Sequence, residues 1–270
     1  MKPLMIGWLK RRRRRKLASG QFSEDWRQII RERFPLYARL GAADQKELES
    51  HILVFIGEKR FEGCKGLVIN DEIRISIAAQ ACLLLLHRPG DYYSRLKSIL
   101  VYPSTYFAQS SHRAPAGIIH ERQEAVLGQS WQHGAVLLAW DSVQAGAANP
   151  FDGQNVVLHE FAHQLDQEDG RADGAPLLGE GSLFRARIAQ YSSWAKIMAA
   201  EFDVFCQTVN RGRKTVLDTY GASNPAEFFA VATECFFEKP KKLLQEHPAL
   251  YSELAKFYCQ NPAEWPDKFD

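Results

Sequence analysis

The five residues from His159 to His163, His-Glu-Phe-Ala-His, constrain this chain more than any other segment. On an α-helix, residues four positions apart lie on the same face, so the two imidazoles can bind one Zn²⁺ together. Glu160 lies about 100° further round the helix, where it can reach a water molecule beside the metal without being a ligand. The pattern therefore predicts a helix that carries a zinc site, and it indicates hydrolytic chemistry.

The flanking sequence predicts that this helix covers about residues 153–167. Asp152 or Gly153 is a suitable N-cap, and apolar residues such as Leu158 and Leu165 surround the motif. The alternative is that both histidines lie on the surface of an ordinary amphipathic helix and bind no metal.

Composition limits the class of protein. The chain has 270 residues and is 46% hydrophobic, which is enough for one large domain with a sizeable core. Its five cysteines are scattered without a CxxC pair, which excludes a disulfide framework and a cysteine-rich zinc site. No segment approaches the roughly 20 apolar residues of a membrane-spanning helix. These features predict a soluble, cytoplasmic protein.

Residues 1–24 differ from the rest because Arg11–Arg15 stand between Lys10 and Lys16. A secretory signal is excluded, since here the charges follow only a few apolar residues. We expect a mobile, solvated basic tail. Contact with an anionic lipid surface, nucleic acid or acidic protein is the alternative. Nucleic acid is the least favoured of these, because no aromatic and basic platform accompanies the tail.

We expect the rest of the chain, residues 25–270, to form one catalytic domain with additional helices at its N-terminal end. Periodicity and capping residues predict an α+β fold that is mainly helical, with a small β-sheet. We expect helices from Trp26 to near Pro35, from Asp44 to about Lys59, from an Asp71 cap through 75–86, and over about 182–209, 225–238 and 241–257, and strands over 98–102 and 134–140.

A catalytic zinc site needs a third protein ligand, and Glu227 is the better of two candidates. Asn224 and Pro225 begin an apolar helix in which Glu227 and Glu234, seven residues apart, share one face. The metal could be the partner of one carboxylate and a ligand histidine the partner of the other. Glu227 could instead serve only as a capping residue.

The other candidate is Asp169, which stands where an HExxHxxGxxD pattern places its third ligand. That pattern needs a glycine at the position of Asp166. Asp166 or Glu234 could orient a ligand imidazole by a hydrogen bond to the ring nitrogen that does not bind the metal. The Tyr220 phenol could donate a hydrogen bond to an oxyanion, and the strand over 134–140 could pair with an extended peptide.

Three segments together resemble the Mlc titration factor A family of bacterial zinc peptidases, whose catalytic core is similar to that of anthrax lethal factor. These segments are Gln129-Ser130-Trp131-Gln132 with Gly134, residues 159–166, and residues 218–231. The resemblance covers about residues 25–262 and leaves the arginine-rich N-terminus outside.

The resemblance implies a zincin-like metallopeptidase core with one Zn²⁺ per chain. By position, His159, His163 and Glu227 match the zinc ligands, Glu160 the general base and Tyr220 the catalytic tyrosine. It also implies aminopeptidase-like hydrolysis of a peptide substrate and binding of the glucose repressor Mlc, which affects the phosphotransferase-system glucose transporter. A non-enzymatic regulator that binds a transcription factor around a mainly structural zinc ion is the alternative.

Overall fold

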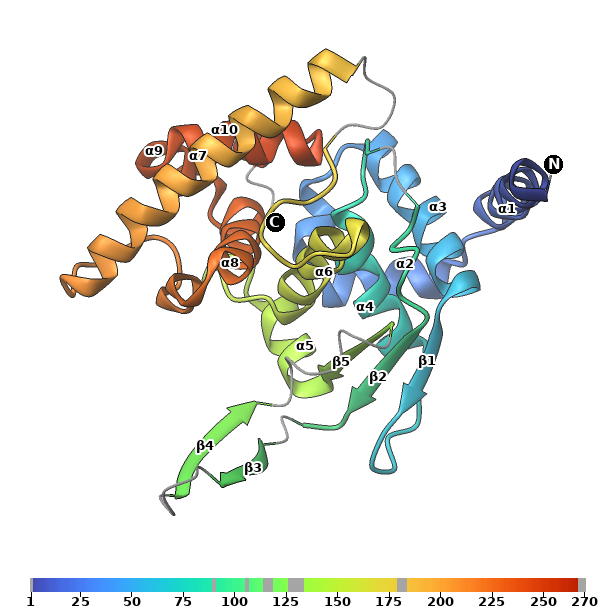
Figure 1. The fold of residues 1–270 in the computed structure, drawn as a ribbon. Helices are drawn as coiled ribbons and strands as arrows, with labels where there is room; N and C mark the ends of the chain where they lie inside the picture. Colours follow the sequence, from blue (N-terminus) through green and yellow to red (C-terminus); the bar gives the residue numbers. More distant parts are fainter. Residues whose placement is uncertain are drawn as a thin grey trace.

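The computed structural model describes residues 2–88, 91–104, 107–113, 119–125, 134–178 and 184–266 (Figure 1). Its α-helices are α1 (Lys2–Ala18), α2 (Glu24–Arg33), α3 (Ala42–Glu58), α4 (Asp71–Leu83), α5 (Trp140–Ala148), α6 (Val156–Asp166), α7 (Phe184–Asn210), α8 (Pro225–Glu238), α9 (Pro240–Glu246) and α10 (Pro248–Tyr258). Its strands are β1 (Arg60–Gly63), β2 (Ser98–Tyr102), β3 (Phe107–Arg113), β4 (Ile119–Ala125) and β5 (Ala135–Ala139). Short 3-10 helices are η1 (Pro35–Arg39), η4 (Gln167–Asp169), η5 (Thr219–Ser223) and η6 (Pro262–Glu264). The expected mainly helical fold with a small sheet is confirmed.

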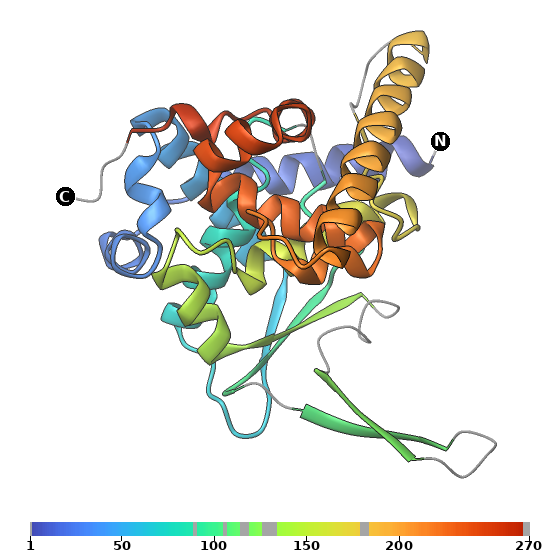
Figure 2. The ribbon, with the colours of Figure 1, turned by 90° about the vertical axis from the view of Figure 1, so that its left-hand side faces the viewer.

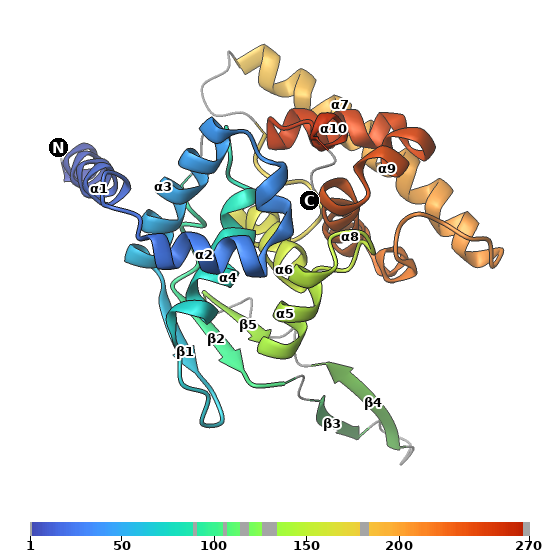
Figure 3. The same cartoon turned by 180° about the vertical axis from the view of Figure 1, so that it is seen from behind.

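A small parallel sheet lies beside the helices. Its strand order is β1-β2-β5, and Ile99 at its centre pairs with Phe61 on one side and Val136 on the other. Ile99 and Val101 are fully buried, so one face of β2 packs into the core. Strands β3 and β4 form a separate antiparallel hairpin that projects from the helical body (Figures 1 and 3). The sequence predicts β2 and β5 correctly but misses β1 and this hairpin.

Helix α4 packs against the N-terminal helices α2 and α3 and against α5 and α6. Ten of its residues are buried, consistent with the expected apolar run. The Asn70 side chain accepts a hydrogen bond from the Ile73 amide at 2.9 Å and caps the helix. Asp71 is therefore the first helical residue and not the cap.

Two further helix boundaries differ from the sequence prediction. Helix α3 begins at Ala42 after Gly41, two residues before the expected cap at Asp44. The single helix expected over 241–257 is two helices, α9 and α10, separated at His247. Pro248 has no amide hydrogen to continue the first helix and restricts the residue before it, so a new helix begins there. The helix over 225–238 is confirmed.

The basic N-terminal segment also differs from expectation. Residues 2–18 form α1, which packs against α3 instead of remaining a solvated tail (Figures 1 and 2). The Arg14 guanidinium donates to both Glu58 carboxylate oxygens, at 2.8 and 2.7 Å, and is also paired with Asp91. Lys10 binds the same Asp91 at 2.7 Å. In the part of the chain described here, no helix has the length and apolar composition needed to cross a bilayer.

Helix α6 lies near the centre of the molecule, between α4, α5 and α8 (Figure 3). Its Phe161 ring is fully buried, 5.6 Å from the ring of Phe55 and 4.9 Å from that of Tyr93. These aromatic contacts join α6 to α3 and to the segment before β2. The position of α6 therefore depends on the N-terminal helices as well as on its own sequence.

We predict that Phe161→Ala lowers the free energy of unfolding by about 3–5 kcal/mol, because it leaves a cavity beside the rings of Phe55 and Tyr93. Urea titration followed by circular dichroism measures the change. Phe151, whose side chain is 55% exposed, provides the control. Phe151→Ala should cost less than about 1 kcal/mol, and equal losses for the two variants would contradict the role given to Phe161.

Candidate active site

The N-terminal end of α6 is built on Asn155. Its side-chain oxygen accepts hydrogen bonds from the amides of Val157 and Leu158, both at 3.1 Å, so Asn155 is the N-cap. The sequence prediction of Asp152 or Gly153 as the cap is wrong by two or three residues. Asp152 instead accepts the Gln154 amide at 2.9 Å in a turn before the helix. The signal for Asn155 was available, since asparagine directly precedes the apolar run.

Both motif histidines lie on the same side of α6. His163 Nε2 lies 3.2 Å from His159 Nε2. Glu227 Oε2 of α8 lies 3.0 Å from His159 Nε2 and 3.3 Å from His163 Nε2. Three potential ligand atoms therefore form a nearly equilateral triangle.

The triangle has the size that a tetrahedral metal site requires. Ligand atoms about 2.0–2.1 Å from a zinc ion are about 3.3 Å apart along a tetrahedron edge, close to the observed separations of 3.0–3.3 Å. His159, His163 and Glu227 could thus hold a metal together. The donor set of two imidazoles and one carboxylate fits zinc, and three protein ligands would leave a fourth position for water or substrate.

The start of α8 explains how Glu227 reaches this position. Asn224 caps the helix by accepting the Glu227 amide at 3.0 Å, and Pro225 occupies its first turn. Both features agree with the sequence prediction. The Glu227 carboxylate oxygen lies against the two imidazoles, so Glu227 is more than a capping residue.

Glu234, two turns further along α8, lies on the other side of the same imidazole. Its Oε1 accepts a hydrogen bond from His159 Nδ1 at 2.7 Å. When Nε2 binds a metal ion, this bond would keep the imidazole proton on Nδ1. The other oxygen of Glu234 accepts the Asn155 amide. Glu234 therefore connects His159 with the N-cap residue of α6.

Glu238 continues this buried network and was not anticipated from the sequence. Its Oε1 accepts a hydrogen bond from Asn155 Nδ2 at 3.0 Å, and its side chain is 2% exposed. Burial raises the pKa of Glu238 to about 8, against the opposing effect of the Asn155 hydrogen bond. The only sequence signal was a third acidic residue, four positions after Glu234, in an otherwise apolar helix.

Glu160 is 4% exposed and makes no hydrogen bond to another described residue. Burial raises its pKa to about 8, and the negative charges of Glu227 and Glu234 add to the shift, although His159 opposes it. A bound cation would lower this pKa again. A desolvated carboxylate with a pKa near neutrality can accept and return a proton.

Tyr220 lies at the open side of the site, on η5. Its side chain is 57% exposed, and its ring centroid is 6.1 Å from that of His159. The Asp218 side chain accepts the Tyr220 amide at 2.8 Å and fixes the start of η5. The phenol is thus near the triangle and accessible to a ligand from solvent.

The two remaining acidic candidates have other partners. Asp166 accepts the Gly174 amide at 2.9 Å, and no hydrogen bond joins it to His159 or His163 in the described part of the structure. It therefore holds the loop after η4 through this bond. Asp169 accepts the Arg171 amide at 2.8 Å and is exposed, away from the triangle. The block Gln129–Gln132 lies outside the described residues.

A second group of potential ligands, Asp44, Glu47 and His87, lies far from this site in the sequence. His87 Nε2 is 2.9 Å from Asp44 Oδ1, and the His87 amide donates to Glu47 at 2.9 Å. Burial disfavours charge on His87, but its bond with Asp44 raises the pKa overall. These three residues pair with one another and connect α3 with the segment that follows α4.

The charges around the triangle favour a cation among its three ligand atoms. Burial opposes charge on His159, but its hydrogen bonds with Glu227 and Glu234 raise its pKa to about 10. Burial likewise opposes charge on Glu227, whereas hydrogen bonds from both histidines lower its pKa to about 2. Burial lowers the pKa of His163, so its imidazole is neutral. A metal ion would therefore displace the second proton of His159 and, by lowering the pKa of Glu160, would also release part of the proton held there.

We predict that divalent metal binding releases between one and two protons per site near pH 7, so that affinity rises at least about tenfold per pH unit between pH 6 and 8. Zinc titration calorimetry in two buffers with different ionisation enthalpies counts the protons. A chelator competition series over this pH range measures the slope. Affinity that does not change with pH would contradict the protonated state assigned to His159.

Comparison with known proteins places this arrangement in a family. The model of the family described as glucose-regulated metallo-peptidase M90 matches residues 8–259. An uncharacterized protein of Synechocystis sp. is 40% identical over 262 residues, which cover 96% of this chain and 91% of that protein. Mlc titration factor A of Klebsiella pneumoniae (strain 342) is 29% identical over 91% of this chain and 89% of its own length. The corresponding protein of Yersinia pestis (strain Pestoides F) is 28% identical over 96% of this chain and 91% of its own length.

These matches confirm the family resemblance and correct its extent. The matched region begins at residue 8, so the arginine-rich segment lies within the family model and not outside it. The matching family consists of metallopeptidases, which agrees with a metal-binding triangle beside a buried carboxylate. This chain belongs to the glucose-regulated metallo-peptidase family M90.

Proposed function

We propose that this chain is a zinc-dependent peptidase with aminopeptidase-like activity, in which His159, His163 and Glu227 bind one Zn²⁺. The observation that carries the proposal is the triangle of ligand atoms at 3.0–3.3 Å, with the buried Glu160 next to one of its histidines on the same helix. A purely structural metal site would need neither an open position nor an adjacent base.

The zinc ion, when bound, supplies Lewis acidity that polarises the peptide carbonyl and makes a water molecule more acidic. Glu160 accepts the proton of the attacking water and transfers it to the leaving amine. Its burial supports this role, because a base with a pKa close to the working pH both gains and loses a proton readily.

Tyr220 donates its phenolic hydrogen to the oxygen that becomes negatively charged during the attack. Its exposure and its position beside the His159 ring support this role. Glu234 holds the His159 ring in one tautomer and orientation, which keeps Nε2 available. Glu227 and Glu234 thus act on opposite nitrogens of one imidazole.

The peptide substrate is proposed to lie along β5. Among the described strands, β5 pairs with β2 on one side only, so its other edge can bind an extended chain through backbone hydrogen bonds. The strand leads directly into α5 and then α6, which brings a bound peptide towards the triangle. We also propose a cytoplasmic location, supported by five free cysteines, of which Cys82 and Cys235 are buried and Cys259 is exposed.

The second candidate function is binding of a transcriptional repressor of the Mlc type. It is supported by the relatives whose name is Mlc titration factor A, at 28–29% identity. Such a regulator could act with or without peptidase activity. An inactive Glu160→Gln protein that still releases a repressor from its operator DNA would favour the regulatory function, whereas loss of release would link it to catalysis.

We predict that Glu160→Gln lowers turnover of aminoacyl reporter substrates by at least about 100-fold while the protein retains one zinc per chain. Glu227→Ala should lose both zinc and activity. Zinc content by atomic emission and initial rates measure these outcomes. Asp169→Asn is the matched control, because Asp169 is exposed and lies away from the triangle, and it should retain both properties.

The same experiment decides between the two functions. Full turnover by Glu160→Gln would remove Glu160 as the base. Retention of zinc by Glu227→Ala would remove Glu227 as a ligand. Stoichiometric zinc in the wild-type protein without turnover on any substrate would favour the binding regulator.

We further predict that Tyr220→Phe lowers kcat by about 100-fold or more with little change in KM, because the phenol acts mainly on the charged transition state. Zinc content should not change, since Tyr220 is not a ligand. Tyr37→Phe is the control, because the Tyr37 hydroxyl bonds Glu49 at 3.0 Å in the N-terminal helices. Unchanged kcat in Tyr220→Phe would leave Tyr220 as a packing residue only.

A further inference from the structure

Positive charge is concentrated in one helix of an otherwise nearly neutral chain. The net charge of the chain is +2, yet all seven residues from Lys10 to Lys16 are positively charged. Two of them, Lys10 and Arg14, are paired with Asp91 and Glu58 and fasten α1 to the body. The helix is therefore fixed in place, and most of its charge is not used in fixing it.

The remaining cations face solvent. Arg11, Arg12, Arg13, Arg15 and Lys16 are all exposed. Of these, Arg13 donates to the Gly57 carbonyl at 3.0 Å, and the Arg12 guanidinium lies 5.6 Å from the Trp8 ring centroid. None of the five is in an ion pair with a described carboxylate. This surface is suited to a partner with several negative charges.

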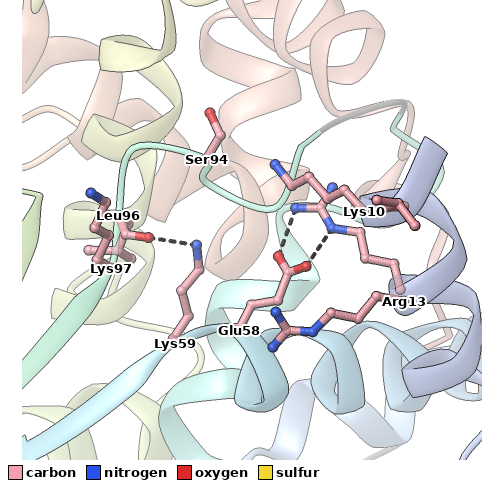
Figure 4. A pocket seen from close by; sticks show the side chains of 9 residues that line it. Lys10, Arg13, Glu58, Lys59, Ser94, Leu96 and Lys97 are labelled. Atoms are coloured by element: carbon pink, nitrogen blue, oxygen red, sulfur yellow. Dashed lines mark hydrogen bonds and ion pairs between the residues drawn. The ribbon is translucent and has the colours of Figure 1, made fainter. Parts of the chain in front are cut away.

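A cavity of about 480 Å³ extends the positive surface between α1 and the start of β1. Lys10, Arg13 and Arg14 line it from α1, Lys59 and Lys97 line it from the body, and Glu58 is the one acidic residue among them (Figure 4). Arg14 and Glu58 pair with each other, and Lys59 donates to the carbonyls of Tyr93 and Leu96 at 2.7 and 2.8 Å. Arg13 and Lys97 lie on opposite sides of this cavity, and both are exposed.

Apolar side chains precede these cations on the same helix. Trp8 and Leu9 are 51% and 50% exposed, and both follow the sequence Leu4-Met5-Ile6. The apolar residues thus occupy the first half of α1 and the cations the second, at the edge of the molecule (Figures 1 and 2). Tryptophan beside basic residues is typical of segments at the boundary between lipid and water.

We propose that α1 docks the protein on an anionic phospholipid bilayer. Trp8 and Leu9 enter the interfacial layer, and the exposed arginines of α1, together with Lys97 at the edge of the cavity, contact lipid phosphates. Each basic residue near such a surface contributes about fivefold to the binding constant. Nucleic acid fits less well, because its phosphates satisfy the cations but leave Trp8 and Leu9 in water.

The test is co-sedimentation of the full chain with vesicles, which does not depend on peptidase activity. Vesicles of equal parts phosphatidylglycerol and phosphatidylcholine should bind the protein, whereas pure phosphatidylcholine vesicles should not. Raising the salt concentration from about 0.1 to about 0.5 M should release most of it, because the Debye length falls.

Three double variants separate the contributions. Arg12→Glu with Arg15→Glu should weaken vesicle binding at least tenfold. Trp8→Ser with Leu9→Ser should weaken it several-fold while leaving its salt dependence in place. Arg211→Glu with Arg213→Glu is the matched control, because both arginines are exposed after α7, and it should bind as the wild type does. Circular dichroism verifies that each variant is folded.

Three results would overturn the proposal. The first is no binding to the anionic vesicles. The others are an equal loss of vesicle binding in the Arg12/Arg15 and Arg211/Arg213 double variants, or unchanged binding of the Trp8/Leu9 double variant. A mixed-sequence DNA duplex is titrated in parallel. Salt-sensitive DNA binding without vesicle binding would show that α1 serves a nucleic acid instead.

Discussion

The candidate site depends on the packing of α6 against α8, because this contact brings two carboxylates to the two nitrogens of one imidazole. Glu227 and Glu234 are separated by two helical turns, about 10.5 Å along the axis of α8. Glu227 lies 3.0 Å from His159 Nε2, and Glu234 lies 2.7 Å from Nδ1. A rotation of either helix would separate these pairs, so the geometry of the metal triangle is a property of the helix interface.

The same interface buries several negative groups, which is costly unless hydrogen bonds or a cation compensate. Asn155 supplies part of the compensation. Its amide hydrogen bonds Glu234, its side-chain nitrogen bonds Glu238, and its side-chain oxygen caps α6. One residue therefore couples the start of the motif helix to both buried acids of α8. The remaining excess of negative charge around the triangle is what a divalent cation would neutralise.

Local sequence rules predicted much of this chain. The HExxH spacing on a helix, the cap and first proline of α8, and strands β2 and β5 follow from periodicity and capping chemistry. Local rules were less accurate where two capping residues stand close together, as at Asp152 and Asn155 or at Asn70 and Asp71. They also predicted a solvated tail at residues 10–16. This prediction was wrong because the partners of Lys10 and Arg14 are distant in the sequence, in α3 and before β2.

The sequence alone indicates which residues are available for chemistry. They are two histidines and a glutamate on one helix, and acidic residues seven positions apart on a second helix. Helical periodicity alone places the two histidines on one face of their helix and Glu227 and Glu234 on one face of theirs. Which carboxylate lies beside which imidazole nitrogen follows only from the tertiary structure. The same is true of the hydrogen bonds of Asp166 with Gly174 and of Glu238 with Asn155. The physical reason is that periodicity defines positions around one helix axis, whereas contacts between helices depend on how their buried faces pack together.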